Sequence, residues 1–220
     1  MKERMMSGKN GARRADTVVV LDFETTGLSP NMGDRAIEIG AVRMEGGVVT
    51  ERFQELMDPG VRISGFIESY TGITNQMLRN APPCGEVMAR FADFIGNDNL
   101  VAHNASFDRK FLDSELARID RGYGGQIACS MLISRRIFQN APNHKLGGLV
   151  NFLDLETDGV FHRALADSEM TARLWMALVN TIREDHDIPE PTFSLMQTIS
   201  RTSKAMVHGV ISGCRRPQSE

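Results

Sequence analysis

Residues 18–27, VVVLDFETTG, place four consecutive aliphatic residues directly before two carboxylates that are separated by one phenylalanine. Side chains alternate across a β-strand, so Asp22 and Glu24 project from the same face at the end of a segment apolar enough to be buried. Two such charges repel each other, and a cation between them would explain the arrangement. Within this stretch alone, exposure to solvent where the strand stops explains it equally well.

The composition describes an ordinary soluble globular chain. It has 220 residues, of which 41% are hydrophobic and 24% charged, and we expect one main domain. The formal net charge is -3, so a polyanionic partner would have to be held by a local basic patch or by bound metal instead of a global field. A histone-like mode of binding is therefore excluded.

The cysteines and the N-terminus indicate a reducing compartment. Cys84, Cys129 and Cys214 are odd in number and lack C-x-x-C spacing, which argues against a disulfide framework and against a structural zinc site. The first fifteen residues are basic without an apolar core, and no run of 18 apolar residues occurs in the sequence. We expect a cytoplasmic protein that is neither secreted nor membrane-spanning.

Periodicity predicts an α/β chain that opens with three antiparallel strands. Alternating residues in 35–44 and a Gly-Gly turn before 48–57 predict a hairpin next to the opening strand. Short buried strands are expected in 99–104 and 124–130. Helices are expected in the following segments: 66–78, 84–96, 106–120, 131–139, 146–155 and 164–182. We divide the chain into a mobile tail (1–15), a main domain (16–182) and a C-terminal appendage with one short helix (183–220).

Two more carboxylates and a histidine stand at the ends of predicted elements. Asp108 begins a helix just after a short strand, where open α/β folds place ligands, although a helix N-terminus favours an acid in any case. Asp167 shares a helical stripe with buried apolar residues, and an acid on an inward face needs a partner. His162 lies five residues earlier, close enough to act at the same site.

These residues form a pattern that resembles a known family. The segments LDFETTG, HNASFD and HRALAD stand in the order and approximate separation of the three motifs of the DEDDh 3'-5' exonucleases, which include proofreading epsilon subunits of bacterial DNA polymerase III. The resemblance runs from about residue 17 to residue 182 and includes all five functional positions. Cys129-Ser130 departs from the Asp-Thr pair that many members carry, at a place outside the metal ligands.

The resemblance implies a ribonuclease H-like fold, a mixed five-stranded sheet flanked by helices. It also implies two divalent cations, Mg²⁺ or Mn²⁺, held by Asp22, Glu24, Asp108 and Asp167, since hard oxygen ligands suit these ions. Two ions roughly 4 Å apart can stabilise both the attacking and the leaving oxygen of a phosphodiester. His162 would take the proton of the attacking water.

Substrate contacts are expected next to the first motif. By resemblance, Thr25, Thr26 and Leu28 would meet the terminal nucleotide and its 3'-hydroxyl, although a polar turn after a strand looks the same. Phe107 could stack on a base, but its one-turn spacing to Phe111 favours packing. Basic residues are expected as phosphate contacts or as an ordinary solvated face: Arg135, Arg136, Lys145 and Arg163.

We therefore expect a 3'-5' exonuclease that acts on single-stranded 3' ends and releases nucleoside monophosphates, with DNA favoured over RNA. An RNA-trimming or oligoribonucleotide-degrading enzyme is the alternative. A catalytically idle binding domain is a rival from another class, which the loss of a metal ligand would have favoured. The chain could be a subunit of a DNA polymerase or act alone. A zinc hydrolase is excluded because no second histidine stands at a ligand spacing, and a P-loop is excluded because TTG lacks the Gly-Lys-Ser/Thr ending.

Overall fold

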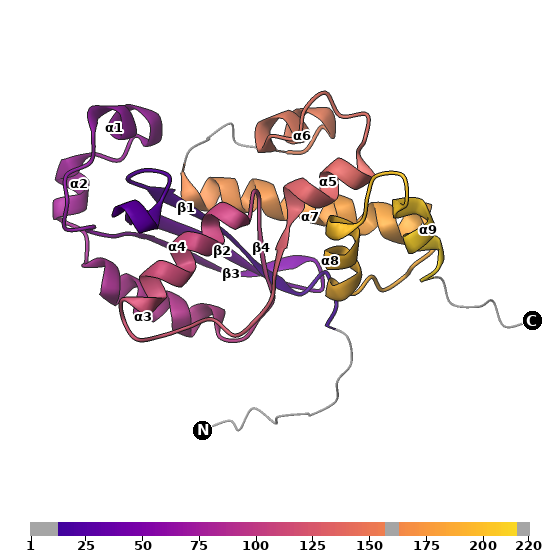
Figure 1. Ribbon diagram of the computed structural model, residues 1–220, viewed down its shortest axis with the longest axis horizontal. Coiled ribbons are helices and arrows are strands. Elements are labelled where there is room, and N and C mark those ends of the chain that lie inside the picture. The colour runs from indigo at the N-terminus through magenta and orange to yellow at the C-terminus, as the bar shows by residue number, and fades with distance from the viewer. Residues whose placement is uncertain (1–12, 157–162, 215–220) are drawn as a thin grey trace, which may run out of the picture.

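The computed structural model describes residues 13–156 and 163–214 (Figure 1). The first three strands are β1 (Val18–Thr25), β2 (Ala36–Glu45) and β3 (Val48–Leu56), with the short 3-10 helix η1 (Pro30–Met32) between the first two. The chain continues with these elements: α1 (Gly65–Thr71), α2 (Asn75–Arg79), α3 (Cys84–Ile95), β4 (Leu100–Ala102), α4 (Ser106–Ala117), β5 (Ile127–Cys129), α5 (Ser130–Ile137), α6 (Leu146–Phe152), α7 (Ala164–Asp185), α8 (Phe193–Arg201) and α9 (Val207–Ser212).

The strands form one mixed sheet in the order β3-β2-β1-β4-β5. β1 and β3 flank β2 in antiparallel pairs, whereas β4 and β5 run parallel to β1. The predicted fold class, a mixed five-stranded sheet flanked by helices, is confirmed. The carboxyl ends of β1 and β4 consequently lie at the same edge of the sheet, where an open α/β fold binds ligands.

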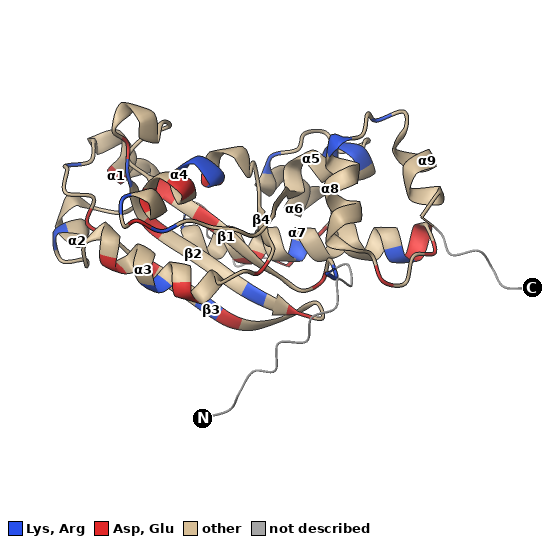
Figure 2. Ribbon diagram, turned by 60° about the horizontal axis from the view of Figure 1, so that its bottom comes forward, with Lys and Arg blue, Asp and Glu red and all other residues tan. Residues whose placement is uncertain are grey.

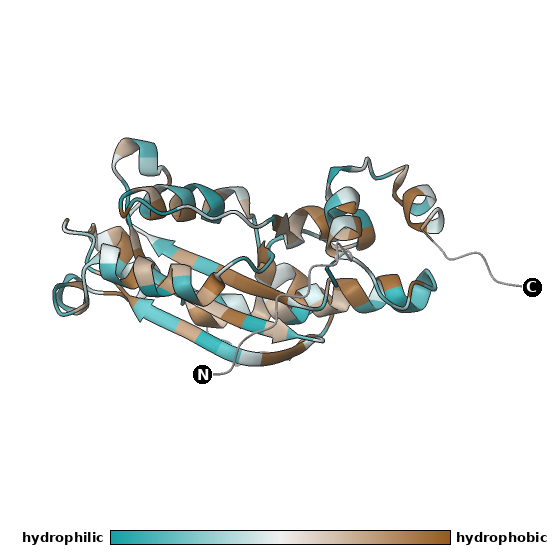
Figure 3. Cartoon of the chain, turned by 90° about the horizontal axis from the view of Figure 1, so that it is seen from below, coloured by the Kyte–Doolittle hydropathy of each residue, from teal (hydrophilic) through white to brown (hydrophobic). Residues whose placement is uncertain are grey.

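Alternation along β1 divides the core into two layers. Val18 and Val20 pack with α5, α7 and α8 on one face of the sheet, and Val19, Leu21 and Phe23 pack with α3 and α4 on the other. Figure 3 shows hydrophobic residues along the inner strands, while the outer strand β3 is largely hydrophilic, in keeping with its exposure. Because the side-chain period is two, Asp22 and Glu24 continue the face covered by α7.

Two local predictions differ from the structure. The segment 66–78 forms two helices, since Gly72 adopts a left-handed conformation (φ 71°) that ends α1, and Thr74 caps α2. Beyond residue 182 the chain forms α8 and α9 instead of one short helix. Phe193 is buried, with its ring centroid 6.1 Å from that of Trp175 in α7. The two prolines just before α8 interrupt the helical pattern, so the sequence did not predict this packing.

Hydrogen bonds join the two flanking segments to each other and the N-terminal one to the main domain. The Ala15 N–H donates to the Pro191 carbonyl (2.9 Å), and the Trp175 indole N–H donates to the Ala15 carbonyl (2.7 Å). The division at residues 15 and 182 stays a prediction. Among the helices that the structure describes, none combines the length and the apolar character needed to cross a bilayer.

Candidate active site

The end of β1 positions the first two carboxylates. Asp22 pairs with Gly40 of β2 and Glu24 with Glu38, while Phe23 points to the opposite face, where its ring centroid lies 6.1 Å from that of Phe91. The ladder shifts register between Glu24 and the next residue, so regular pairing ends at the second acid. Strand geometry thus fixes both carboxylates on the face of the sheet that α7 covers.

The first turn of α7 brings in the third carboxylate, Asp167. A Cβ added to Gly40 would lie 2.1 Å from the Ala164 carbonyl carbon, so only glycine permits the helix to approach β2 this closely. The Ser168 hydroxyl donates to the Gly40 carbonyl (2.9 Å) and holds this contact. One carboxylate oxygen from each of Asp22, Glu24 and Asp167 consequently lies within 4.8 Å of the others.

The fourth predicted ligand, Asp108, lies beside this group. It is 1% exposed in the first turn of α4, and its carboxylate accepts the Phe23 N–H at 3.2 Å. It is not one of the three carboxylates that meet within 4.8 Å. Its negative charge nevertheless acts on Asp22.

Burial and mutual repulsion disfavour ionisation of these acids. Desolvation, followed by the charges of Asp108 and other neighbouring carboxylates, raises the pKa of Asp22 well above its usual value. Burial and the nearby Asp167 charge raise the pKa of Glu24 to about 8. Burial likewise raises the pKa of Asp108 to about 7, against the effect of the Phe23 N–H. The metal-free site therefore holds protons at a pH where ordinary carboxylates are ionised.

The donor set fits a hard divalent cation. Among the described residues, no lysine or arginine lies within ion-pair distance of Asp22, Glu24 or Asp108. A divalent cation would neutralise the repulsion that raises their pKa values, and carboxylate oxygens are the ligands that Mg²⁺, Mn²⁺ and Ca²⁺ prefer. The observation that carries this fit is the convergence of three carboxylates at one point.

A neighbouring buried acid, Glu38, is satisfied by a different partner. It is 0% exposed, and Arg163 donates to it from two nitrogens, at 3.1 and 2.8 Å. The Ala164 N–H (3.1 Å) and the Gln54 amide (2.9 Å) donate to it as well. Arg163, which the sequence suggested as a phosphate contact or as part of a solvated face, ties the start of α7 to β2. Neither Glu38 nor Gly40 was identified as important from the sequence, where both look like ordinary alternating residues of a strand.

The carboxylates lie in a cleft of about 780 Å³. The three predicted substrate residues, Thr25, Thr26 and Leu28, all line it. The Thr25 hydroxyl donates to the Gly27 carbonyl (2.6 Å) and the Thr26 hydroxyl to Asp34 (3.2 Å), so both brace the turn after β1. Leu28 is 80% exposed and is the member of this set most available for contact.

An aromatic wall, which we define as Phe66, Tyr70 and Phe107, lines the same cleft. The Phe66 and Tyr70 rings are stacked, with centroids 5.9 Å apart and an interplanar angle of 13°, and Phe66 is 73% exposed. Phe107 also packs on Phe111, with centroids 5.0 Å apart, so it serves the core and the cleft together. Phe66 and Tyr70 were not predicted from the sequence, although their spacing of four residues places them on one helical face.

His103, which was not predicted as a site residue from the sequence, connects the cleft to α5. Its Nδ1 lies 2.9 Å from the Ser130 hydroxyl, and its Nε2 lies 3.0 Å from the His144 carbonyl. Since a carbonyl only accepts, Nε2 carries the proton. Burial lowers the pKa of His103 to about 4, so the ring is neutral near pH 7. The predicted base, His162, lies outside the described residues.

Comparisons with known proteins agree with this geometry. The exonuclease family model of the RNase T type matches residues 19–175. The chain is 33% identical to the DNA polymerase III subunit epsilon of Aquifex aeolicus over 167 residues, which cover 76% of this chain and 82% of that protein. It is also 33% identical to the PolC-type DNA polymerase III of Caldanaerobacter subterraneus over 180 residues, 82% of this chain. The chain spans only 13% of the length of that polymerase.

A solved structure of exonuclease X in complex with 5' overhanging duplex DNA superposes on the fold with a TM-score of 0.66. The two chains are 27% identical, and the match covers 83% of this chain and 98% of the other.

Proposed function

Because this chain belongs to the exonuclease family that its sequence and fold match, we propose that it is a divalent-metal-dependent 3'-to-5' exonuclease of single-stranded ends. The proposal includes a preference for DNA over RNA. The observation that carries it is the group formed by Asp22, Glu24 and Asp167 at the end of β1, inside a cleft with an exposed aromatic wall. The proposed product is a nucleoside 5'-monophosphate.

Each acid has a proposed role in holding Mg²⁺ or Mn²⁺. Asp22, Glu24 and Asp167 would supply the convergent oxygens, and Asp108 would complete the set from α4. When bound, two such ions stabilise negative charge on the attacking and leaving oxygens of a phosphodiester. The Phe23 N–H holds Asp108 in place from β1, the strand that also carries Asp22 and Glu24. The protein thereby fixes the ligand oxygens before substrate arrives.

The remaining residues would bind the nucleic-acid strand and accept a proton from the attacking water. His162 would accept a proton from the attacking water, as the family resemblance implies. Thr25 and Thr26 would position the terminal nucleotide, because their hydroxyls hold the turn after β1 in a fixed conformation. The exposed Leu28 would separate the last two bases. The aromatic wall offers ring faces to bases without regard to sequence. A single strand fits such a site because its bases are unpaired and available for stacking.

Labelled oligonucleotides test the reaction directly. With Mg²⁺ or Mn²⁺, a 5'-labelled single strand should shorten as a ladder, and excess EDTA should stop the reaction. A 3' phosphate should block degradation, because the terminal site is built for a hydroxyl. Cutting of a circular single strand would show that no end is needed. Matched DNA and RNA strands decide between this proposal and the exoribonuclease alternative.

The setting of the reaction is also proposed. The relative from Aquifex aeolicus is named as a polymerase subunit, which supports a test of association with a DNA polymerase. The cysteines Cys84, Cys129 and Cys214 are free thiols, which fits a reducing cytoplasm. Purification of the tagged chain from its own cells, followed by identification of bound proteins, would show whether it acts alone.

A further inference from the structure

Acidic residues are absent from two segments of the chain, so the charge of both segments is purely positive. Residues 130–153, which contain α5 and α6, carry three lysines or arginines and no acidic residue. Residues 191–214, which contain α8 and α9, carry two and again no acidic residue. The whole chain has more acids than bases, with a net charge of -3. Figure 2 accordingly shows α5, α6 and α8 without acidic residues, whereas β3, α3 and α4 carry both signs.

These two segments form one continuous surface. The Arg136 guanidinium donates to the Thr202 carbonyl (3.1 Å), and the Gln139 amide donates to the Lys204 carbonyl (3.3 Å). The turn after α8 therefore packs against the C-terminal end of α5. Arg135, Arg201 and Lys204 are exposed there, and none of them has an acidic partner within ion-pair distance among the described residues.

The surface begins at the cleft. Lys145 is exposed between His144, whose carbonyl accepts from His103, and Leu146; both His103 and Leu146 line the cleft. Ser130 at the start of α5 contacts the same histidine, at 2.9 Å. The charge of Arg135 is close enough to contribute to the lowered pKa of His103. Lys145 and Arg135 therefore lie at the mouth of the cleft.

From these positions we propose that α5 and the turn after α8 form a basic track for the 5'-ward part of a single strand whose 3' end is in the cleft. The track consists of Lys145, Arg135, Arg201 and Lys204. This inference rests on the proposed exonuclease function and extends it to nucleotides that are not being cleaved. From Ser130 to Arg136 the helix rises about 9 Å, more than two phosphate spacings of a stacked strand at about 3.4 Å each.

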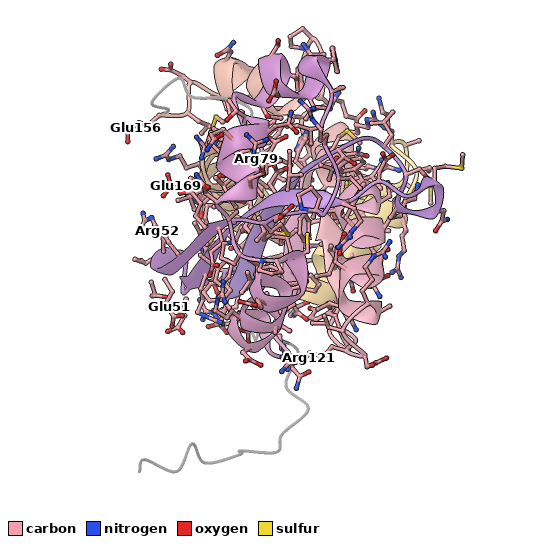
Figure 4. All side chains as sticks on the ribbon, turned by 90° about the vertical axis from the view of Figure 1, so that its left-hand side faces the viewer. Glu51, Arg52, Arg79, Arg121, Glu156 and Glu169 are labelled. Atoms are coloured by element: carbon pink, nitrogen blue, oxygen red, sulfur yellow. The ribbon has the colours of Figure 1, made fainter. Side chains whose placement is uncertain are left out.

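A charge-removal variant with a matched control tests the track. The test variant is Arg135→Gln/Lys145→Gln/Lys204→Gln in the full chain. The control, Arg79→Gln/Arg90→Gln/Arg121→Gln, also removes three exposed positive charges. Two of the control arginines already pair with acids, Arg90 with Glu55 and Arg121 with Asp93, and Arg79 lies on α2. Arg79 and Arg121 are labelled in Figure 4, which faces the side of the molecule remote from α9.

The substrates are dT20 and dT4, each with a 5' fluorescent label. In the test variant, kcat/KM for dT20 should fall about tenfold relative to wild type, and the fall for dT4 should be several times smaller. The slope of log(kcat/KM) against log[salt] for dT20 should become shallower by about 2, since each single-strand phosphate contact contributes about 0.7. The control variant should keep the wild-type preference for dT20 over dT4.

Binding without turnover separates the two proposals. Fluorescence anisotropy of labelled dT20 in EDTA should show weaker and less salt-dependent binding by the test variant only. Equal losses on dT20 and dT4, or an unchanged salt slope, would overturn the track while leaving the exonuclease standing. A wild-type chain that binds dT20 but cuts neither strand with any divalent metal would instead reject the proposed function. If the triple variant does not fold by circular dichroism, Arg135→Gln and Lys204→Gln are measured singly against Arg90→Gln, with about twofold effects expected.

Discussion

Two groups of buried or partly buried carboxylates differ in their partners. Asp16, Glu38 and Glu115 are almost fully buried, and each is held by arginine at ion-pair distance, for example Arg183 on Asp16 and Arg35 on Glu115. We call these the paired acids. The unpaired acids are Asp22, Glu24 and Asp108, which have no lysine or arginine within that distance among the described residues.

The difference shows in their ionisation. Hydrogen bonds from Arg14, assisted by Arg183, lower the pKa of Asp16 to about 2, whereas burial among other acids raises the pKa of Glu24 to about 8. The charge of each paired acid is balanced by an arginine of the same chain, so these acids stabilise the fold. Unpaired acids hold protons unless a cation from outside favours their ionised form, so we expect them to serve the reaction. The predictions below test this division, from the largest expected effect to the smallest.

Removal of an unpaired acid should cost activity and leave the fold intact. In Asp22→Ala the exonuclease rate should fall by on the order of 10⁴-fold or more, because a ligand oxygen of the metal site is lost. The free energy of unfolding in EDTA should stay the same or rise, since a mutually repelling charge is removed. Rates on a labelled strand and thermal unfolding measure the two effects. A variant that turns over normally would show that Asp22 holds no catalytic metal.

Loss of the proposed base should have the next largest effect. His162→Ala should lower the rate by about 10² to 10⁴-fold, the usual worth of a positioned base. Wild-type activity should climb with pH between about 6 and 8, because the base must be neutral. The residual activity of the variant should keep rising at alkaline pH, where hydroxide replaces the assisted water. The measurement is the rate as a function of pH for wild type and variant at saturating Mn²⁺. A variant with the wild-type rate at pH 7 would show that His162 is not the base.

Removal of a paired acid should cost stability first. Glu38→Gln leaves the Arg163 guanidinium without its anionic partner and should lower the free energy of unfolding by about 3 kcal/mol. The companion variant Glu38→Gln/Arg163→Met should regain part of this loss, since no unpaired charge remains. Urea unfolding in EDTA provides the measurement. If Glu38→Gln proves as stable as wild type, the division between paired and unpaired acids fails at this position.

The free energy of unfolding, measured as a function of pH, should show the effects of both the paired and the unpaired acids. The unpaired acids Glu24 and Asp108 have pKa values of about 8 and about 7, raised from 4.5 and 3.8, so the folded metal-free chain binds more protons than the unfolded chain in this range. Its free energy of unfolding should therefore fall as pH rises from about 4 to about 8, by at least about 1.4 kcal/mol. Below pH 4 the sign reverses, because the depressed pKa of Asp16 means that its stabilising charge is lost toward pH 2.

Saturating Mg²⁺ should make the free energy of unfolding less dependent on pH between about 4 and 8, since bound cations favour the ionised acids. It should leave the dependence below about pH 4 unchanged. Urea titrations at each pH with EDTA or Mg²⁺ provide the measurement. A metal-free curve that is flat between pH 4 and pH 8 would contradict the raised pKa values of the unpaired acids.

Local sequence patterns were sufficient to predict much of the fold. The aliphatic run before Asp22, the hairpin after it and the helical stripe ending at Ile182 predicted the strands and the long helix, because strand and helix periods are local properties. The mixed five-stranded sheet was implied by the family resemblance. Motif order likewise identified the family, and three of the four predicted metal ligands meet in space.

Other features required the folded chain. Glu38 is separated by 125 residues from Arg163, and Gly40 by 124 from Ala164, so no local pattern could reveal that these contacts seat the helix that carries Asp167. The aromatic wall and the basic track likewise combine residues from distant segments. The sequence alone determined which residues are ionisable and where most strands and helices form, since both follow from a residue and its neighbours. Only the tertiary structure decided which acids received arginine partners and which did not, because a counter-charge depends on packing between elements far apart in the chain.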